Sequence, residues 1–239
     1  MGRATYLPQV LRAADVPVIR YPGCEFRGSS SLSPAWQIFH HTASSASGGN
    51  TPSARICANG RPDLAGPLCQ VLWARNGTAV IIATGRANHA GEGRYPDGVR
   101  NDNGHSIGHE CENNGLGEPW PQRQLENIQR GMAAIAKHNG WPMTGTWAGR
   151  VQGHREYAPT RKIDPANVNL PAFRRGISTA LGGFRMDDEA RRRFDKLEEI
   201  TRNQGDTTRD RIGAAADRIV AAVGNAADRI IAALRPPGG

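Results

Sequence analysis

Three residues far apart in the sequence have side chains that together could hold a catalytic metal ion. His40 is followed 114 residues later by His154, and Asp164 comes ten residues after His154. Two imidazoles and one carboxylate, with a fourth coordination position left open, form the ligand set of a catalytic rather than a structural zinc site. Zinc bound in this way lowers the pKa of a water molecule to about 7, which supplies a hydroxide nucleophile at neutral pH. These residue types therefore predict a hydrolase that activates water.

Two adjacent histidines compete for the first ligand position. Residues 36–43, Trp-Gln-Ile-Phe-His-His-Thr-Ala, are expected to form a short buried strand that runs into a polar loop. Successive side chains of a strand point to opposite faces, so only one of His40 and His41 can face a given site. The apolar pattern leaves both choices open, because Ile38 shares a face with His40 and Phe39 shares one with His41.

Four parts of the chain carry motifs that resemble those of a known enzyme family. They are residues 39–43 (Phe-His-His-Thr-Ala), 86–91 (Arg-Ala-Asn-His-Ala-Gly), 106–110 (Ser-Ile-Gly-His-Glu), and 153–155 (Gly-His-Arg) together with 162–165 (Lys-Ile-Asp-Pro). With these motifs the chain resembles the zinc-dependent type 2 N-acetylmuramoyl-L-alanine amidases, whose relatives include the peptidoglycan recognition proteins. The motifs span most of residues 1–178. Residues 6–28 further resemble the amidase endolysins of phages that infect actinobacteria.

The resemblance implies a particular ligand set. In this family the first histidine of the His-His-Thr run binds zinc, which implies that His40, His154 and Asp164 are the ligands and that Zn²⁺ is the cofactor. Some relatives use a cysteine as the third ligand at a shorter spacing. The Asp-Pro form at residues 164–165 is the other known form.

The resemblance also implies residues that act on the substrate. Glu110 matches the acidic catalytic position and is expected to be the general base toward the zinc water, with protonation of the leaving amine as a second role. Lys162 is expected to present its cation to the developing oxyanion, where loss of such a donor costs about 10²- to 10³-fold in rate. Independently of the resemblance, His89 is a candidate for substrate contact near the metal, with a structural role as an equal alternative.

Local patterns predict the elements that must position these residues. Residues 70–73 and 79–83 are expected to be strands joined by a hairpin across Asn76 and Gly77. A helix is expected from Gln122 to His138, with an apolar stripe of Leu125, Ile128, Met132 and Ile135. The fold class expected is α/β, a central mixed β-sheet flanked by helices with the metal at one end of the strands, followed by a C-terminal helical tail.

Length and composition predict an enzyme domain with an appendage. The 239 residues suit one ordinary domain and a smaller unit, and we expect a zinc amidase domain over residues 1–180 and a linker with a helical region over residues 181–239. Asp-Arg-Ile recurs at 210, 217 and 228, and the apolar spacing of residues 207–234 is typical of a coiled-coil seam. Self-association is therefore the leading expectation for this tail, ahead of packing on the enzyme domain or lying on a membrane.

The cysteines and the N-terminus bear on where the chain acts. The four cysteines form no C-x-x-C pair, and buried free thiols are expected. The start of the chain has no apolar signal segment, and no stretch is long and uncharged enough to be transmembrane. The expected course is synthesis in a host cytoplasm and action on the bacterial cell wall after holin-dependent release.

The charge distribution bears on partners. Residues 186–239 contain ten basic and ten acidic residues, so the whole net charge of +8 lies in residues 1–185. The cations are scattered without a recognition helix or interleaved aromatics, which argues against nucleic acid. Anionic wall polymers are the expected electrostatic partner, with an ordinary solvated surface as the alternative.

Three functions remain in competition. The leading one is a peptidoglycan hydrolase, a phage endolysin that cuts the amide bond between N-acetylmuramic acid and L-alanine of the stem peptide. A recognition protein that binds peptidoglycan without cutting it is a second possibility, which the complete ligand set opposes. The third is a virion-associated wall hydrolase.

Overall fold

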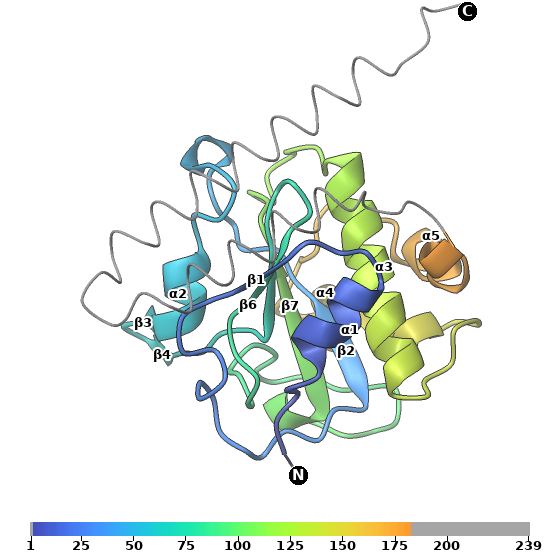
Figure 1. Ribbon diagram of the computed structural model, residues 1–239, viewed down its shortest axis with the longest axis horizontal. Helices are drawn as coiled ribbons and strands as arrows, with labels where there is room; N and C mark the ends of the chain where they lie inside the picture. Colours follow the sequence, from blue (N-terminus) through green and yellow to red (C-terminus); the bar gives the residue numbers. More distant parts are fainter. Residues whose placement is uncertain (1, 183–239) are drawn as a thin grey trace, which may run out of the picture.

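The computed structural model describes residues 2–182 of the chain (Figure 1). The predicted coiled coil of residues 207–234 lies outside the described residues. The boundary near residue 180 likewise stays a prediction.

The described residues form short helices and strands around one larger helix. The α-helices are α1 (Leu7–Ala13), α2 (Ala54–Asn59), α3 (Gln122–His138), α4 (His154–Tyr157) and α5 (Leu170–Arg175). The strands are β1 (Val18–Arg20), β2 (Trp36–Phe39), β3 (Gly60–Arg61), β4 (Leu64–Ala65), β5 (Val71–Trp73), β6 (Ala79–Ile81), β7 (Ser106–Cys111) and β8 (Val151–Gly153). The 3-10 helices are η1 (Ala46–Gly48), η2 (Asn103–His105), η3 (Ala148–Arg150), η4 (Gly176–Ser178) and η5 (Ala180–Gly182).

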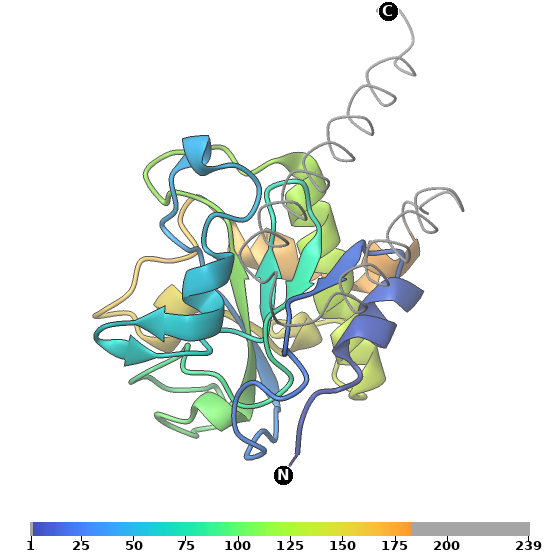
Figure 2. The same ribbon diagram turned by 60° about the vertical axis from the view of Figure 1, so that its left-hand side comes forward.

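Six strands form the central sheet in the order β1-β6-β5-β7-β2-β8. Only the β5–β6 pair in this sheet is antiparallel, and the other four pairs are parallel. Figures 1 and 2 show α1 and α3 on one side of the sheet and α2 with the small β3–β4 hairpin on the other. The predicted α/β class with a mixed sheet flanked by helices is confirmed.

The predicted hairpin forms where its turn residues require it. Gly77 has a φ of 83°, a left-handed conformation that glycine adopts without strain. The Asn76 side-chain oxygen accepts a hydrogen bond from the Thr78 backbone N–H at 3.0 Å, which closes the turn between β5 and β6.

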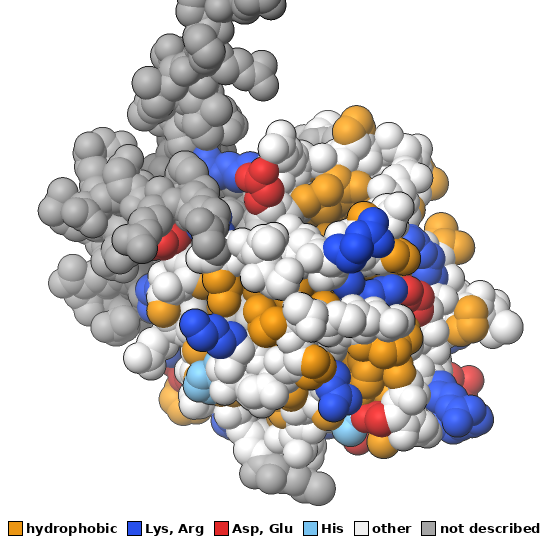
Figure 3. All heavy atoms as spheres, turned by 90° about the vertical axis from the view of Figure 1, so that its right-hand side faces the viewer, with side chains coloured by type: hydrophobic (Ala, Val, Ile, Leu, Met, Phe, Trp, Pro, Cys, Tyr) orange, Lys and Arg blue, Asp and Glu red, His pale blue; other side chains and the backbone are white. Residues whose placement is uncertain are grey.

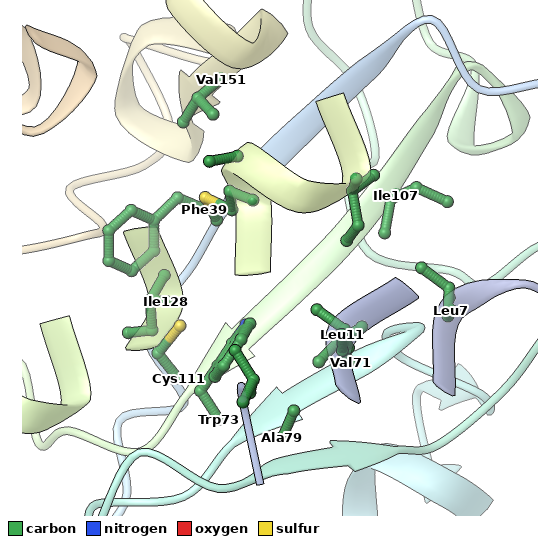
Figure 4. Close-up of a cluster of buried hydrophobic side chains, with 14 of the residues drawn as sticks. Leu7, Leu11, Phe39, Val71, Trp73, Ala79, Ile107, Cys111, Ile128 and Val151 are labelled. Atoms are coloured by element: carbon green, nitrogen blue, oxygen red, sulfur yellow. The ribbon is translucent and has the colours of Figure 1, made fainter. Parts of the chain in front are cut away.

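The apolar stripe of α3 packs on the sheet as predicted. Ile128, Met132 and Ile135 are fully buried, and Leu125 is partly buried against the same cluster. Figure 4 shows Ile128 near Phe39 of β2 and Trp73 of β5, so the helix covers the strands that lead to the site. Burial of one such side chain stabilises the fold by roughly 1.5–3 kcal/mol. The helix bounds agree with those predicted from the sequence.

All four cysteines are buried free thiols, as predicted. None of the helices in the described part of the chain is both long and apolar enough to cross a membrane.

Candidate metal centre

The two histidine ligands lie together because their strands are neighbours. His40 directly follows β2, and His154 is the first residue of α4, directly after β8. The two strands run parallel with Phe39 paired to Gly153, so both end at the same edge of the sheet. This register places the next residue of each strand side by side. Sheet pairing therefore joins residues that are 114 positions apart in the sequence.

Asp164 reaches the same place from the loop after α4. Its backbone oxygen accepts a hydrogen bond from the Arg155 backbone N–H at 2.7 Å, which folds the loop back onto the start of α4. Asp164 Oδ2 lies 2.9 Å from His154 Nδ1 and 3.4 Å from His40 Nδ1. The two Nδ1 atoms are 2.9 Å apart. The three residues are buried, and one ligand atom from each lies within 4.8 Å of the others.

The other nitrogen of each ring already has a partner. His154 Nε2 lies 3.0 Å from the Ala90 backbone oxygen, which can only accept, so Nε2 carries the hydrogen and a neutral ring has its lone pair on Nδ1. His40 Nε2 lies 3.2 Å from His89 Nδ1. His89 Nε2 in turn lies 3.4 Å from the Ser106 hydroxyl oxygen, which can accept. In the His89 tautomer that carries its hydrogen on Nε2, Nδ1 accepts from His40 Nε2–H. Both ligands then direct Nδ1 toward Asp164.

This donor set fits a divalent metal such as zinc. Two nitrogen lone pairs and a carboxylate oxygen converge on one buried point, and a bound cation would relieve the repulsion between them. Two imidazole nitrogens and one carboxylate oxygen are ligands that zinc accepts in catalytic sites. The structure thus brings together all three residues that the sequence predicted as ligands.

The electrostatics keep these groups ready to bind metal. Burial, reinforced by the neighbouring His154, lowers the pKa of His40 to about 4, so its ring is neutral at physiological pH. Burial alone would raise the pKa of Asp164, but the interactions with the adjacent His154 and His40 rings hold that pKa well below its usual range. A neutral imidazole and an ionised carboxylate are the protonation states that metal binding needs.

His41 points away from this centre. Its Nδ1 accepts a hydrogen bond from the Ala166 backbone N–H at 3.1 Å, and its ring packs so closely on Gly115 that a Cβ there would lie 2.4 Å from it. The apolar pattern left open which of the two histidines faces the site. In the structure His40 faces the ligand cluster, and His41 forms a hydrogen bond with the loop that contains Ala166.

Glu110 lies beside the three ligand residues, on the strand next to β2. The His40 backbone N–H donates to the His109 backbone oxygen at 2.9 Å, which places the end of β7 alongside His40. The Oε2 atom of Glu110 is enclosed and has no hydrogen-bond partner in the described structure. Burial raises the pKa of Glu110 well above its ordinary value, and the negative charges of Asp164 and Glu112 raise it further. A raised pKa makes the carboxylate a stronger proton acceptor than an ordinary glutamate, which suits an acid–base catalyst.

Lys162 contributes positive charge to the same place. Its backbone N–H donates to the Ala158 backbone oxygen at 2.9 Å, which fixes the start of the loop that carries Asp164. The Lys162 charge lowers the pKa of both His40 and Glu110, although burial is the largest influence on each. The predicted cation is thus near the site, and its role toward an oxyanion stays a prediction.

His89 is buried behind the metal ligands. Its side chain is 8% exposed, and its ring lies edge-on to the His40 ring with centroids 5.3 Å apart. A direct contact with substrate, one of the two roles expected from the sequence, stays a prediction. The contacts that the structure places on His89 are those of a partner of His40.

Glu112 is a residue that the sequence reasoning missed. It is fully buried and accepts hydrogen bonds from the hydroxyls of Thr42, Ser44 and Ser53 and from the Ser53 backbone N–H at 2.8 Å. These bonds tie the loop that follows His40 to the end of β7. Its position two residues after Glu110, on the same face of the strand, was the available signal.

His109 precedes Glu110 on β7, so its side chain lies on the opposite face of the strand, where its contacts are structural. Its Nδ1 accepts from the Trp73 indole at 3.0 Å and its Nε2 lies 3.0 Å from the Gln37 side-chain oxygen. Burial, with a smaller contribution from His40, lowers the pKa of His109 to about 3.

The pKa of His109 predicts part of the acid sensitivity of the metal-free protein. The unfolded chain takes up a proton at His109 near pH 6.5 that the folded protein does not take up until about pH 3, so stability falls as the pH is lowered through this interval. One such proton changes the free energy of unfolding by about 1.4 kcal/mol per pH unit. Urea unfolding between pH 7 and 5 should show a shallower fall for His109→Gln than for the wild type, and equal slopes would contradict the prediction.

The fold and the site together define a metal-dependent hydrolase of the α/β class. The N-acetylmuramoyl-L-alanine amidase family model matches residues 31–167, a range that contains the three ligands and Glu110. The chain therefore belongs to this family, and the enzyme class is N-acetylmuramoyl-L-alanine amidase acting on peptidoglycan. No curated protein sequence gives a match to the chain.

Solved structures of amidases have a similar fold. The selenomethionine derivative of AmpD matches with a TM-score of 0.49 and 21% identity, over 70% of this chain and 94% of AmpD. AmpDh3 from Pseudomonas aeruginosa matches with a TM-score of 0.44 and 21% identity, over 76% of this chain and 71% of AmpDh3. The Ph2119 endolysin from Thermus scotoductus MAT2119 bacteriophage Ph2119 matches with a TM-score of 0.43 and 16% identity, over 70% of this chain and 99% of the endolysin. The family assignment comes from the sequence match and not from these structures.

Proposed function

We propose that this amidase is a phage endolysin that hydrolyses the amide between the lactyl group of N-acetylmuramic acid and L-alanine of the stem peptide, with a water molecule activated at a zinc site. The observation that carries the mechanism is the convergence of His40 Nδ1, His154 Nδ1 and Asp164 Oδ2 beside the enclosed Glu110 carboxyl. The motifs in residues 6–28 that resemble actinobacteriophage endolysins support the phage role.

The residues of this chain divide the chemistry between them. Zinc held by His40, His154 and Asp164 would supply the Lewis acidity that lowers the pKa of water. Glu110, with its raised pKa, takes the proton from the attacking water and returns it to the departing amine of L-alanine. Lys162 places its positive charge where the carbonyl oxygen becomes negative.

A recognition protein that binds peptidoglycan without cutting it is the less favoured alternative. Such a protein needs no complete set of metal ligands, and this chain retains all three in one buried cluster. A virion-associated wall hydrolase would use the same site and differ in location, so detection of the protein in purified particles would favour it over an endolysin.

Digestion of purified peptidoglycan tests the reaction. Mass spectrometry of the products should find peptides with a new L-alanine amino terminus, and addition of a chelator should abolish them. Products with any other new terminus would show that a different bond is cut, and unchanged peptidoglycan with zinc-loaded protein would favour the recognition protein.

The proposal extends to the surface charge and to the location. On the face shown in Figure 3 the Lys and Arg side chains are spread over the surface, and several lie beside Asp or Glu side chains. A net charge of +8 would steer the enzyme toward anionic wall polymers at long range rather than form one binding patch. Synthesis in the host cytoplasm, with holin-dependent release to the cell wall, belongs to the endolysin proposal.

Deletion of residues 186–239 tests the tail, which lies outside the described residues. The truncated protein should fold, bind zinc and cut soluble muropeptides like the full chain, but it should be monomeric and weaker on intact walls. Multivalent attachment raises avidity by about 10²-fold or more without new contacts, so the deficit should appear on the polymer.

Light scattering and wall-lysis assays on both forms provide the measurements. A full-length protein that stays monomeric at every accessible concentration would remove the self-association proposal. A truncated protein that fails to fold would show that the tail packs on the enzyme domain.

A further inference from the structure

One short stretch of backbone lies directly behind both histidine ligands. His89 Nδ1 is 3.2 Å from His40 Nε2, and the backbone oxygen of the next residue, Ala90, is 3.0 Å from His154 Nε2. Two adjacent residues therefore contact the two ligand rings on the sides that face away from Asp164. Any shift of this stretch would turn both rings at once.

The backbone N–H groups of residues 89–91 are all bound by one side chain. The Asn103 amide oxygen accepts hydrogen bonds from the backbone N–H groups of His89 at 3.1 Å, Ala90 at 2.7 Å and Gly91 at 3.3 Å. Arg161 donates from Nη2 to the Ala90 oxygen at 2.9 Å, on the same carbonyl that faces His154. Asn103 therefore fixes the backbone N–H groups of residues 89–91, and Arg161 helps to fix the Ala90 backbone oxygen.

The ring of His89 is held by close packing against β7. A Cβ at Gly108 would lie 2.5 Å from the His89 ring, so only glycine at this position lets the ring lie against the strand. The opposite edge of the ring reaches the Ser106 hydroxyl at 3.4 Å. Strand β7 thus supports His89 from behind while Glu110, two residues after Gly108, lies beside the ligands.

We propose that residues 89–91 form an orienting clamp, with His89 and Asn103 as positioning residues that make both histidines offer Nδ1 to the metal. Histidine can bind metal through either ring nitrogen, and the partner of the second nitrogen decides which one is free. The clamp supplies a hydrogen-bond acceptor to the Nε2–H of each ligand. The acceptor is His89 Nδ1 for His40 and the Ala90 backbone oxygen for His154. This inference rests on the proposed function, because it takes His40, His154 and Asp164 as zinc ligands.

Zinc affinity, measured by competition with a chromophoric chelator in the absence of substrate, tests the clamp. Asn103→Ala removes the oxygen that holds residues 89–91 and should weaken zinc binding by about 10- to 100-fold, the usual effect of losing a partner of a metal ligand. Asn103→Asp keeps an oxygen acceptor and should restore most of the affinity. His89→Leu should weaken binding similarly, whereas His89→Asn, whose amide oxygen can take the place of Nδ1, should recover part of it.

A second readout separates orientation from general loss of stability. Protein loaded with cobalt in place of zinc should show an altered visible absorption spectrum in Asn103→Ala and His89→Leu, because the ligand geometry changes. Asn101→Gly is the matched control: its side-chain oxygen accepts from the Gly93 backbone N–H at 2.9 Å in the same region, and its φ of 53° suits glycine. This control should leave zinc affinity and the cobalt spectrum unchanged.

The outcomes distinguish the clamp from the proposed function. Wild-type affinity and an unchanged cobalt spectrum in both Asn103→Ala and His89→Leu would overturn the clamp. Wild-type protein that binds zinc but does not cut peptidoglycan would overturn the proposed function. The clamp could still be tested in that case, because zinc affinity and the cobalt spectrum do not depend on hydrolysis. If Asn103→Ala does not fold by circular dichroism, the His89→Leu and His89→Asn pair gives the same comparison at the other positioning residue.

Discussion

Replacing any one of the three ligands, His40, His154 or Asp164, by alanine should abolish both zinc binding and hydrolysis. Each substitution removes one of the three ligands that the described residues bring together in a buried cluster, and the two that remain leave too few donors for tight binding. Metal analysis should find about one zinc per wild-type molecule and almost none in the variants. Zinc at 100 times its dissociation constant should raise the free energy of unfolding of the wild type by about 2.7 kcal/mol and leave that of the variants unchanged.

His41→Ala is the matched control for the first ligand. His41 follows His40 directly, yet it bonds to the Ala166 backbone N–H and packs on Gly115, outside the ligand cluster. We expect this variant to keep close to a full equivalent of zinc. Full zinc in His40→Ala together with loss in His41→Ala would reverse the ligand assignment.

Local sequence patterns predicted the elements whose signals are complete within a short window. The helix from Gln122 to His138 has Pro121 before it, Gly140 after it and an unbroken apolar stripe, and its observed bounds agree with the prediction. The hairpin across Asn76 and Gly77 is similar, because a two-residue turn signal lies between two apolar runs. Helix α3 and the β5–β6 hairpin are determined by residues close together in the sequence, so local patterns are sufficient to predict them.

The strands β1 and β8 were not predicted, although β8 leads directly into the site. Each has only three residues, too few for an alternating pattern to stand out, and neither adjoins a hairpin turn signal like the one that revealed β5 and β6. Local patterns could not predict that His40 and His154 lie close together, because this proximity depends on the pairing of β2 with β8 in the sheet. The family resemblance supplied that information by pairing the two histidines directly.

The partners of the ligands were the least visible part of the site. Asn103 acts through its side-chain oxygen on three backbone N–H groups, and backbone groups carry no residue-specific signal. His89 lies within the motif of residues 86–91, but its contact with His40 spans 49 residues and is made in the folded state alone. Glu112 was passed over because a buried acceptor of hydroxyl hydrogen bonds looks like any acidic residue in the sequence.

Glu110→Gln should keep the fold and the metal but lose most of the turnover. The substitution preserves the shape of the side chain and removes its ability to exchange a proton with water and the leaving amine, a contribution of about 10²- to 10⁴-fold. We expect the loss in kcat, with little change in KM or in zinc content. Glu126→Gln on the exposed face of α3 changes the same chemical group far from the ligands and should retain wild-type kinetics.

The stability of the metal-free protein gives an independent check on Glu110. Burial raises the pKa of Glu110 in the folded state, whereas the unfolded chain releases this proton at the ordinary pKa of 4.5. Above pH 4.5 the folded protein therefore binds the proton more strongly than the unfolded chain, and the free energy of unfolding falls as the pH rises. Glu110→Gln removes this cost, so the metal-free variant should be more stable than the wild type at neutral pH while its zinc-loaded form is nearly inactive. Greater stability with lost turnover is the pattern expected of a carboxyl group kept for catalysis. Wild-type hydrolysis rates in Glu110→Gln would remove this residue from the mechanism, and a less stable metal-free variant would show that the carboxylate is paired in the fold.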